Sequence, residues 1–120
     1  MRHLLMDLVM DIYSYSTSNS LANGSTTFFG TYYDNTSYID PRESDWRWCQ
    51  IKLYGGNFDD DLLSSSNITF RSTVAHEMGH VFGLDENNSD STSIMCQAYR
   101  RNRTVLGPNA NDCIGINEIY

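Results

Sequence analysis

The sequence has no long hydrophobic run and little positive charge. None of its stretches reaches the about 20 consecutive apolar residues that a transmembrane helix needs. Eight Lys and Arg stand against fifteen Asp and Glu, which gives a formal net charge of −7 and a pI near 4.6. Because phosphate binding requires a basic surface, this balance argues against a nucleic-acid partner. We therefore expect neither a membrane span nor a nucleic-acid ligand.

Closely spaced cysteine pairs and an export signal are also missing. The three cysteines, Cys49, Cys96 and Cys113, form no C-x-x-C pair, which argues against a structural cysteine–zinc site. We expect Cys96 and Cys113 to be buried free thiols, because both adjoin apolar residues in segments that should pack. A disulfide between them is the alternative in an exported chain. Asp7 and Asp11 interrupt the apolar residues near the N-terminus, so we expect no secretory signal in this chain.

The length and composition fit one small domain over residues 1–120. With 40 % hydrophobic residues, the chain can form one core. Residues 13–66 are rich in Ser, Thr, Asn, Tyr and Gly, which is typical of short strands joined by loops. We predict strands over residues 26–33 and 48–54, the second with Cys49, Ile51 and Leu53 on one face and ended by Gly55-Gly56. Residues 1–12 fit helical spacing, whereas residues 9–15 also suit a strand.

One segment, His76-Glu77-Met78-Gly79-His80, has the spacing of a metal-binding motif. Two histidines four residues apart lie on one face of a helix, so both imidazoles can reach one zinc ion with Glu77 beside it. The bare motif also occurs by chance. Here, however, Gly83 follows three residues after the second histidine, and the acidic pair Asp85-Glu86 follows at five and six. The extended pattern makes chance a poor explanation and predicts the core of a zinc hydrolase.

The residues after the motif predict a third metal ligand. A helix is expected from about Thr69 to Phe82, and Gly83 suits the left-handed residue that often ends a helix. Catalytic zinc usually takes three protein ligands and leaves a fourth position for water. The only other histidine, His3, is far away in sequence. The third ligand is therefore expected to be a carboxylate, either Glu86 or its neighbour Asp85.

The extended motif resembles that of the metzincin zinc endopeptidases, His-Glu-x-x-His-x-x-Gly-x-x-(His or Asp). Matched by position, His76 and His80 would bind zinc and Glu77 would be the catalytic carboxylate. Glu86 falls in the third-ligand position, where the usual histidine is missing and snapalysin-like members place Asp. Asp85 remains the alternative third ligand.

Segments farther along the chain resemble the matrixin branch of this family. Ser93-Ile94-Met95 is similar to the turn that places a methionine, here Met95, beneath the zinc. Residues 108–120 are similar to the closing helix, although Asn111 and Cys113 depart from its pattern. The resemblance is strong over residues 70–120, weaker over 26–69 and absent before.

The resemblance implies an α+β fold with a small twisted mixed β-sheet, an active-site helix, a methionine turn and a C-terminal helix. Residues 1–66 would form a strand-rich upper part, residues 67–83 the active-site helix, and residues 84–120 the remaining elements. It also favours a strand from about residue 8. A full matrixin catalytic domain is longer, and the missing part would be the first strand and first long helix. The chain would then be either an N-terminally truncated fragment or a minimal variant of the family.

The implied function is a zinc-dependent endopeptidase in which Glu77 acts as general base and acid on a protein or peptide substrate. The substrate would pair with an exposed strand edge at Phe28, Phe29, Gly30 and Thr31, the alternative being an ordinary core strand. By resemblance the protein would be extracellular, and we expect a monomer. Ca²⁺ binding at Asp59-Asp60-Asp61 is only weakly supported, and a solvated acidic loop is favoured. The alternative function is an inactive zinc-binding remnant that acts as a binding or structural module.

Overall fold

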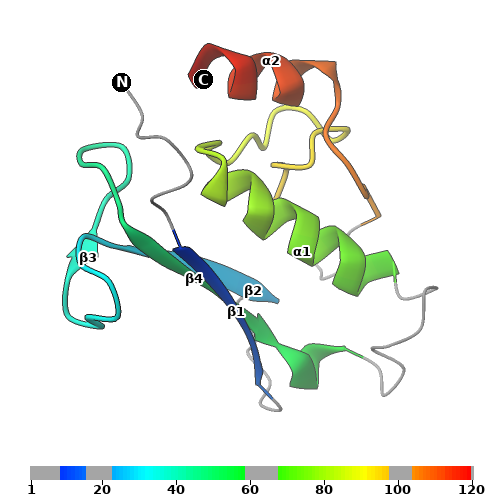
Figure 1. Cartoon of the computed structure of the whole chain (residues 1–120). Coiled ribbons are helices and arrows are strands. Elements are labelled where there is room, and N and C mark those ends of the chain that lie inside the picture. Colours follow the sequence, from blue (N-terminus) through cyan, green and yellow to red (C-terminus); the bar gives the residue numbers. More distant parts are fainter. Residues whose placement is uncertain (1–8, 16–22, 59–67, 98–103, 120) are drawn as a thin grey trace.

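The residues that the structure describes form one small sheet with two helices on the same side of it (Figure 1). The computed structural model describes residues 9–15, 23–58, 68–97 and 104–119. The strands are β1 Val9–Tyr15, β2 Gly24–Phe29, β3 Tyr38–Ile39 and β4 Trp48–Tyr54. The helices are α1 Ile68–Val81 and α2 Ala110–Ile119, and a short 3₁₀ helix, η2 Gly55–Asn57, follows β4.

The sheet is mixed, with the strand order β1-β4-β2-β3. β1 runs parallel to β4, and its register begins with Val9 opposite Trp48. β2 runs antiparallel both to β4 and to the two-residue β3. This arrangement confirms the α+β class and the strand expected from about residue 8. It also confirms the predicted strand over residues 48–54 and its end at Gly55-Gly56.

Strict alternation along β4 decides which side chains form the core. Cys49, Ile51 and Leu53 point to the side of α1 and are fully or almost fully buried. This matches the face predicted for them from the period of two in a strand. The core cluster on this side of the sheet consists of Phe28, Trp46, Cys49, Ile51, Leu53 and Val81.

The strand predicted over residues 26–33 is shorter at its end than expected. β2 stops at Phe29, and Tyr33 has a positive φ of 57°, which a strand does not contain. The chain turns because Gly30 N–H donates to the Ser37 carbonyl at 2.8 Å and the Asp34 carbonyl accepts from Ser37 N–H. The prediction was too long because Tyr32 and Tyr33 are residue types that favour strands, whereas here they lie in the turn after β2.

All three cysteines are free thiols. Cys49 is buried, and burial together with the nearby charge of Asp11 raises its pKa to about 12. Cys96 is only partly buried and Cys113 is exposed, so the expectation that both are buried is wrong. Cys113 lies on α2, whose contacts with the rest of the molecule leave this side chain facing solvent.

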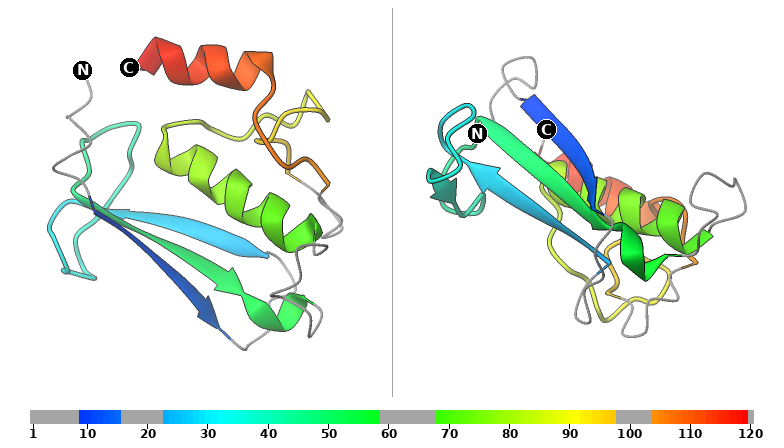
Figure 2. Two further views of the ribbon diagram at one scale, coloured as in Figure 1. Left: turned by 45° about the vertical axis from the view of Figure 1, so that its right-hand side comes forward. Right: turned by 90° about the horizontal axis from the view of Figure 1, so that it is seen from below.

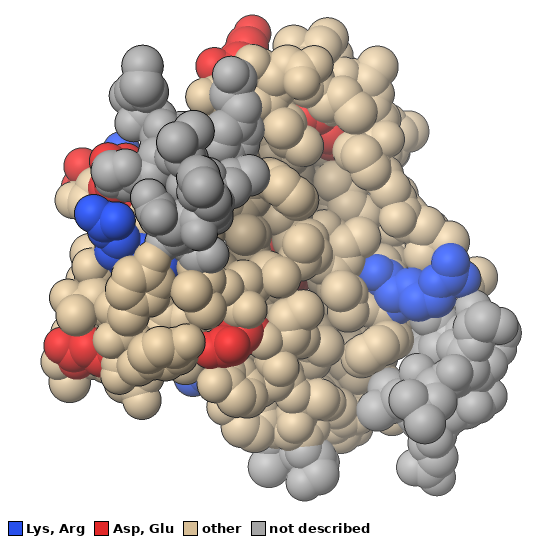
Figure 3. Space-filling view, in the orientation of Figure 1, with Lys and Arg blue, Asp and Glu red and all other residues tan. Residues whose placement is uncertain are grey.

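The elements stack in three layers, with α1 between the sheet and α2 (Figure 2). α2 begins at a capping box, in which Asp112 N–H donates to the Asn109 side chain and Asn109 N–H donates to the Asp112 carboxylate. On the face seen in Figure 3, acidic and basic side chains lie near one another at the left edge, and uncharged residues cover most of the described surface. Among the described residues, no helix is long and apolar enough to cross a bilayer.

Candidate metal centre

The centre of the site is the pair of histidines on α1. His76 and His80 are one turn apart, so their rings lie on the same face of the helix, with centroids 4.9 Å apart and planes at 86°. The His76 side chain is 6 % exposed and that of His80 is 20 % exposed. One ring is therefore locked in the interior while the other reaches the surface.

The end of α1 turns the following residues back toward these rings. Gly83 has a φ of 99°, which confirms the left-handed conformation expected there. Its N–H donates to the His80 carbonyl at 2.9 Å, and Leu84 N–H donates to the Gly79 carbonyl at 3.0 Å. This pair of bonds is the Schellman motif. A residue with a Cβ would be strained at this position, so the glycine determines the direction in which the chain leaves the helix.

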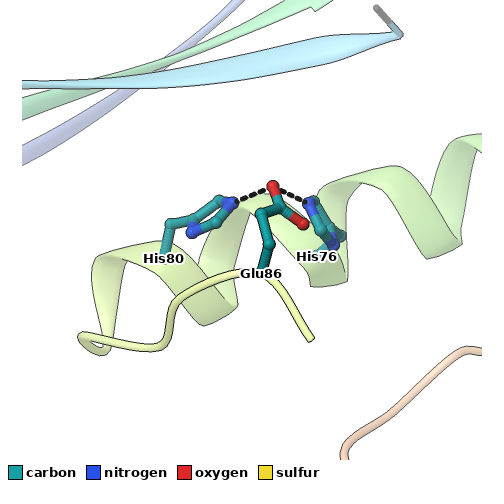
Figure 4. A group of neighbouring side chains, drawn as sticks. All are labelled: His76, His80 and Glu86. Carbon is teal, nitrogen blue, oxygen red and sulfur yellow. Dashed lines mark hydrogen bonds and ion pairs between the residues drawn. The ribbon is translucent and has the colours of Figure 1, made fainter. Parts of the chain in front are cut away.

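The turn brings Glu86 between the two histidines (Figure 4). Its Oε1 atom lies 3.0 Å from Nε2 of His80 and 3.3 Å from Nε2 of His76. Two ligands of a tetrahedral zinc ion, each bound at ~2.0–2.1 Å, lie roughly 3.3–3.4 Å apart, which is close to the spacing of Oε1 of Glu86 from each Nε2 atom. Asp85 is exposed and is not part of this group, and its charge acts on Arg42 instead.

Hydrogen bonds to the main chain set the orientation of both rings. Nδ1 of His76 donates to the Ile94 carbonyl and Nδ1 of His80 to the Leu84 carbonyl, each at 2.8 Å. A neutral ring that donates through Nδ1 has a lone pair on Nε2. Both lone pairs would then face the Glu86 carboxylate, an arrangement that is favourable only when a cation lies among them. The donor set of His76, His80 and Glu86 therefore suits a metal ion.

In the metal-free protein, protons would take the place of this cation. Burial raises the pKa of Glu86, but hydrogen bonds with His76 and His80 outweigh it and lower the pKa to about 2. Burial likewise lowers the pKa of His80, yet the contacts with Glu86 and the Leu84 carbonyl raise it on balance. Both shifts show that the site stabilises positive charge beside Glu86.

Glu77 follows His76 on α1 and is 5 % exposed. One of its carboxylate oxygens, Oε2, accepts a hydrogen bond of 2.6 Å from Oγ1 of Thr26 on β2. The strand approaches the helix closely because residue 24 is a glycine: a Cβ there would meet Cγ of Glu77 at 3.3 Å. Sheet and helix together thus enclose the carboxylate.

Met95 packs against Gly79, which directly precedes His80 on α1. It is 1 % exposed, and a Cβ on Gly79 would overlap its sulfur atom. The carbonyl of Met95 also accepts the N–H of Asn87 at 2.9 Å. The residue after Glu86 is thereby attached to the segment that carries Met95.

Asp112, for which the sequence alone predicted no role, is buried and is linked to the site through Ile94. Its carboxylate accepts the Ser93 hydroxyl at 2.5 Å and the Ile94 N–H at 2.9 Å. Ile94 in turn accepts the hydrogen bond from His76. The spacing Asn109-x-x-Asp112 could have indicated a capping box, but not that the same carboxylate reaches a turn 18 residues away. Thr26 was also missed, because 51 residues separate it from Glu77.

The strand edge predicted to bind substrate at residues 28–31 is not free in the structure. Phe28 pairs with Ile39, and Phe29 pairs with Tyr38. Gly30 N–H donates to the Ser37 carbonyl, as described above. The prediction is corrected on this point, because residues 37–39 fold back along the end of β2 and occupy its hydrogen-bonding groups. Thr31 N–H likewise donates to the Ser37 hydroxyl at 3.1 Å.

Two segments considered in the sequence lie outside the described residues. They are His3 and the possible calcium site at residues 59–61.

Comparison with known proteins identifies the family. The family model for matrixin matches residues 14–120. No curated protein and no solved structure matches the chain. The matched stretch contains the whole of α1, the Glu86 loop and the described part of α2. The chain belongs to the matrixin family of metallopeptidases.

Proposed function

We propose that this protein is a zinc-dependent endopeptidase, with zinc held by His76, His80 and Glu86. The observation that supports this most directly is the convergence of two Nε2 atoms and one carboxylate oxygen on one point, with both rings anchored through Nδ1. A set of two imidazoles and a carboxylate is known from catalytic zinc sites. Membership of the matrixin family favours zinc in the same position.

Glu77 acts as the general base and acid. When bound, zinc polarises the scissile carbonyl and lowers the pKa of water. Glu77 is next in sequence to His76 and lies on β2's side of α1, where its carboxylate takes a proton from that water and passes it to the leaving amine. No covalent bond between protein and substrate is needed.

We further infer that an extended peptide binds along β2 at residues 24–27. In the described part of the chain, the pairing of β2 with β3 involves only Phe28 and Phe29. The preceding residues of β2 run past Glu77, as the contact with Thr26 requires. Backbone pairing with a strand edge recognises peptides of many sequences. The substrate is accordingly a protein or peptide, and family resemblance favours an extracellular setting.

Met95 would form an apolar floor of the metal site, which corresponds to the methionine turn of the family. Its contact with Gly79 and its hydrogen bond with Asn87 support this role. An apolar group in this position restricts the imidazoles and excludes water from behind them.

The test measures zinc and proteolysis in the same preparation. Elemental analysis should find one zinc per chain, and casein should be cleaved in a reaction that a chelator stops and added zinc restores. Glu77→Gln should retain zinc and lose at least about 100-fold in rate, the low end of what an acid–base group contributes. Glu118→Gln, on the exposed part of α2, is the matched control and should cleave normally.

The same experiment distinguishes the active enzyme from the alternative, an inactive zinc-binding remnant. A protein that binds zinc but cleaves no casein, so that wild type and Glu77→Gln behave alike, would be the inactive remnant. The presence of a buried carboxylate beside the histidines favours the active enzyme, because burying Glu77 has a cost that a purely structural metal site does not require.

A further inference from the structure

Thr26 contacts Glu77, although neither residue belongs to the group that would bind the metal. Its hydroxyl lies 2.6 Å from Oε2 of Glu77 and 3.3 Å from the main-chain carbonyl of the same residue. A hydroxyl has one proton to donate, and the shorter contact to the carboxylate is the stronger. Thr26 thus fixes one of the two oxygens of Glu77.

The place of Thr26 in the sheet makes this contact specific. Gly24, Thr26 and Phe28 alternate onto the side of β2 that faces α1, and Phe28 belongs to the core cluster on that side. Thr27 is the neighbouring residue and is also partly buried, but it belongs to the opposite face, opposite Gln50. Two adjacent threonines therefore differ in one respect: only Thr26 is directed at Glu77.

The side chain of Glu77 has rotatable bonds that burial alone does not fix. Gly24 brings the strand near Cγ of Glu77, which restricts the stem, whereas the orientation of the carboxylate plane depends on what its oxygens bind. A bond to Oε2 sets that plane and leaves Oε1 for the exchange of protons. Catalytic groups must be held to within about 0.5 Å of their productive position by such neighbours.

We propose that Thr26 is a positioning residue for the reaction: its hydroxyl holds the Glu77 carboxylate in the orientation in which Glu77 transfers protons. This inference rests on the proposed role of Glu77 as general base. Thr26 touches neither the metal nor the scissile bond. Its loss should therefore affect the rate of the chemical step and leave both metal and substrate binding in place.

The experiment compares Thr26→Val, which has the same shape without the hydroxyl, with Thr26→Ser, which keeps the hydroxyl. The matched control is Thr36→Val, at an exposed threonine whose hydroxyl likewise binds a carboxylate, that of Asp34 at 2.6 Å. For the zinc-loaded enzymes, kcat and KM are measured on a peptide taken from a casein cleavage site, along with zinc content. Thr26→Val should lose at least about tenfold in kcat with KM changed by less than about twofold, since misplacing a catalytic group by 1 Å can cost about 100-fold. Thr26→Ser should recover most of the rate, and Thr36→Val should behave as wild type.

A second measurement does not depend on activity. In the metal-free protein, Thr26→Val should lower the urea midpoint of unfolding, and this shift should disappear in a Glu77→Ala background, because the hydroxyl then has no carboxylate to bind. If Thr26→Val fails to fold, Thr26→Ala replaces it, and the same fall in kcat and the same rescue by serine are required.

The outcomes separate this inference from the proposed function. Wild-type kcat in Thr26→Val, or a serine variant as slow as valine, would overturn the positioning role. If Glu77→Gln abolishes cleavage in the same assay, the proposed function stands and only the inference about Thr26 is lost. If Glu77→Gln cleaves normally, the proposed function itself is wrong.

Discussion

The carboxylate of Asp112 accepts the N–H of Ile94 at 2.9 Å, and the carbonyl of the same Ile94 accepts Nδ1 of His76 at 2.8 Å. One residue, Ile94, therefore connects the first turn of α2 with His76. The Asp112 carboxylate also accepts from Ser93 and Asn109, so three donors depend on it. Because Asp112 is 4 % exposed, water cannot readily replace it.

Removal of this carboxylate should weaken both the fold and the metal site. Asp112→Ala leaves buried donors without an acceptor and should lower the free energy of unfolding by about 3 kcal/mol or more. Zinc affinity should fall by roughly 10- to 100-fold, the usual effect of losing a group that orients a ligand. Asn111→Ala, at the exposed neighbouring position, is the control for both measurements. Unchanged zinc affinity in Asp112→Ala would mean that Ile94 is held in place without α2.

Glu86 and Asp85 should differ sharply in their effect on zinc. Glu86→Ala removes the oxygen that lies near both Nε2 atoms. The loss of zinc affinity should therefore exceed the roughly 10- to 100-fold that is typical when a residue hydrogen-bonded to a metal ligand is removed. Asp85→Ala should have little effect, because the Asp85 carboxylate is not among the groups that converge with the two histidines. Competition with a chromophoric chelator measures both. The opposite ranking would show that the loop binds zinc in a register shifted by one residue.

Gly79 should resist substitution because of Met95. In an isolated helix, Gly→Ala stabilises by about 1 kcal/mol, but here the added methyl would meet the buried sulfur, and overpacking costs about 1–3 kcal/mol. Gly79→Ala should therefore destabilise the protein in urea unfolding. In a Met95→Ala background the same change should become neutral or stabilising. A stabilising Gly79→Ala in the wild-type protein would contradict the packing described here.

Met95 itself should tolerate an apolar substitute. Met95→Leu keeps volume and hydrophobicity, so it should cost under about 1.5 kcal/mol and leave zinc bound. Met95→Asp would place a charge in a fully buried position and should abolish folding or metal binding. Circular dichroism and zinc content test both variants.

The metal-free protein should be stabilised by Glu86 and His80 within a limited pH window. The pKa of Glu86 is lowered from 4.5 to about 2, so its contribution is present above pH 4.5 and is lost as the pH falls toward 2. The pKa of His80 is raised above 6.5, so its contribution is present below pH 6.5 and is lost as the pH rises through the raised value. Both contributions are complete only between pH 4.5 and 6.5.

This pH dependence of stability is measured by urea unfolding of the protein after a chelator has removed the metal, at pH values below, within and above that window. Glu86→Gln should flatten the profile, because the neutral amide cannot stabilise a charged imidazole. Wild-type and Glu86→Gln profiles of the same shape would show that the pair contributes nothing in the absence of metal.

Local features could be predicted from the sequence because they depend on residues close together in the chain. The period of the helix alone places His76 and His80 on one face, and the need for a positive φ explains Gly83. The alternation along residues 48–54 likewise identified the buried face of β4. In each case the physical cause acts over a few residues.

Other features were decided only when distant segments met. The choice of Glu86 over Asp85 at the histidines depends on how the loop is attached, through Gly79 at one end and the Met95 carbonyl at the other. The return of residues 37–39 along β2 covers the edge at Phe28 that the sequence had suggested for substrate. The contacts of Thr26 with Glu77 and of Asp112 with Ile94 join residues 51 and 18 positions apart. Local propensities carry no information about such pairs, because their geometry depends on the packing of sheet, loop and helix against one another.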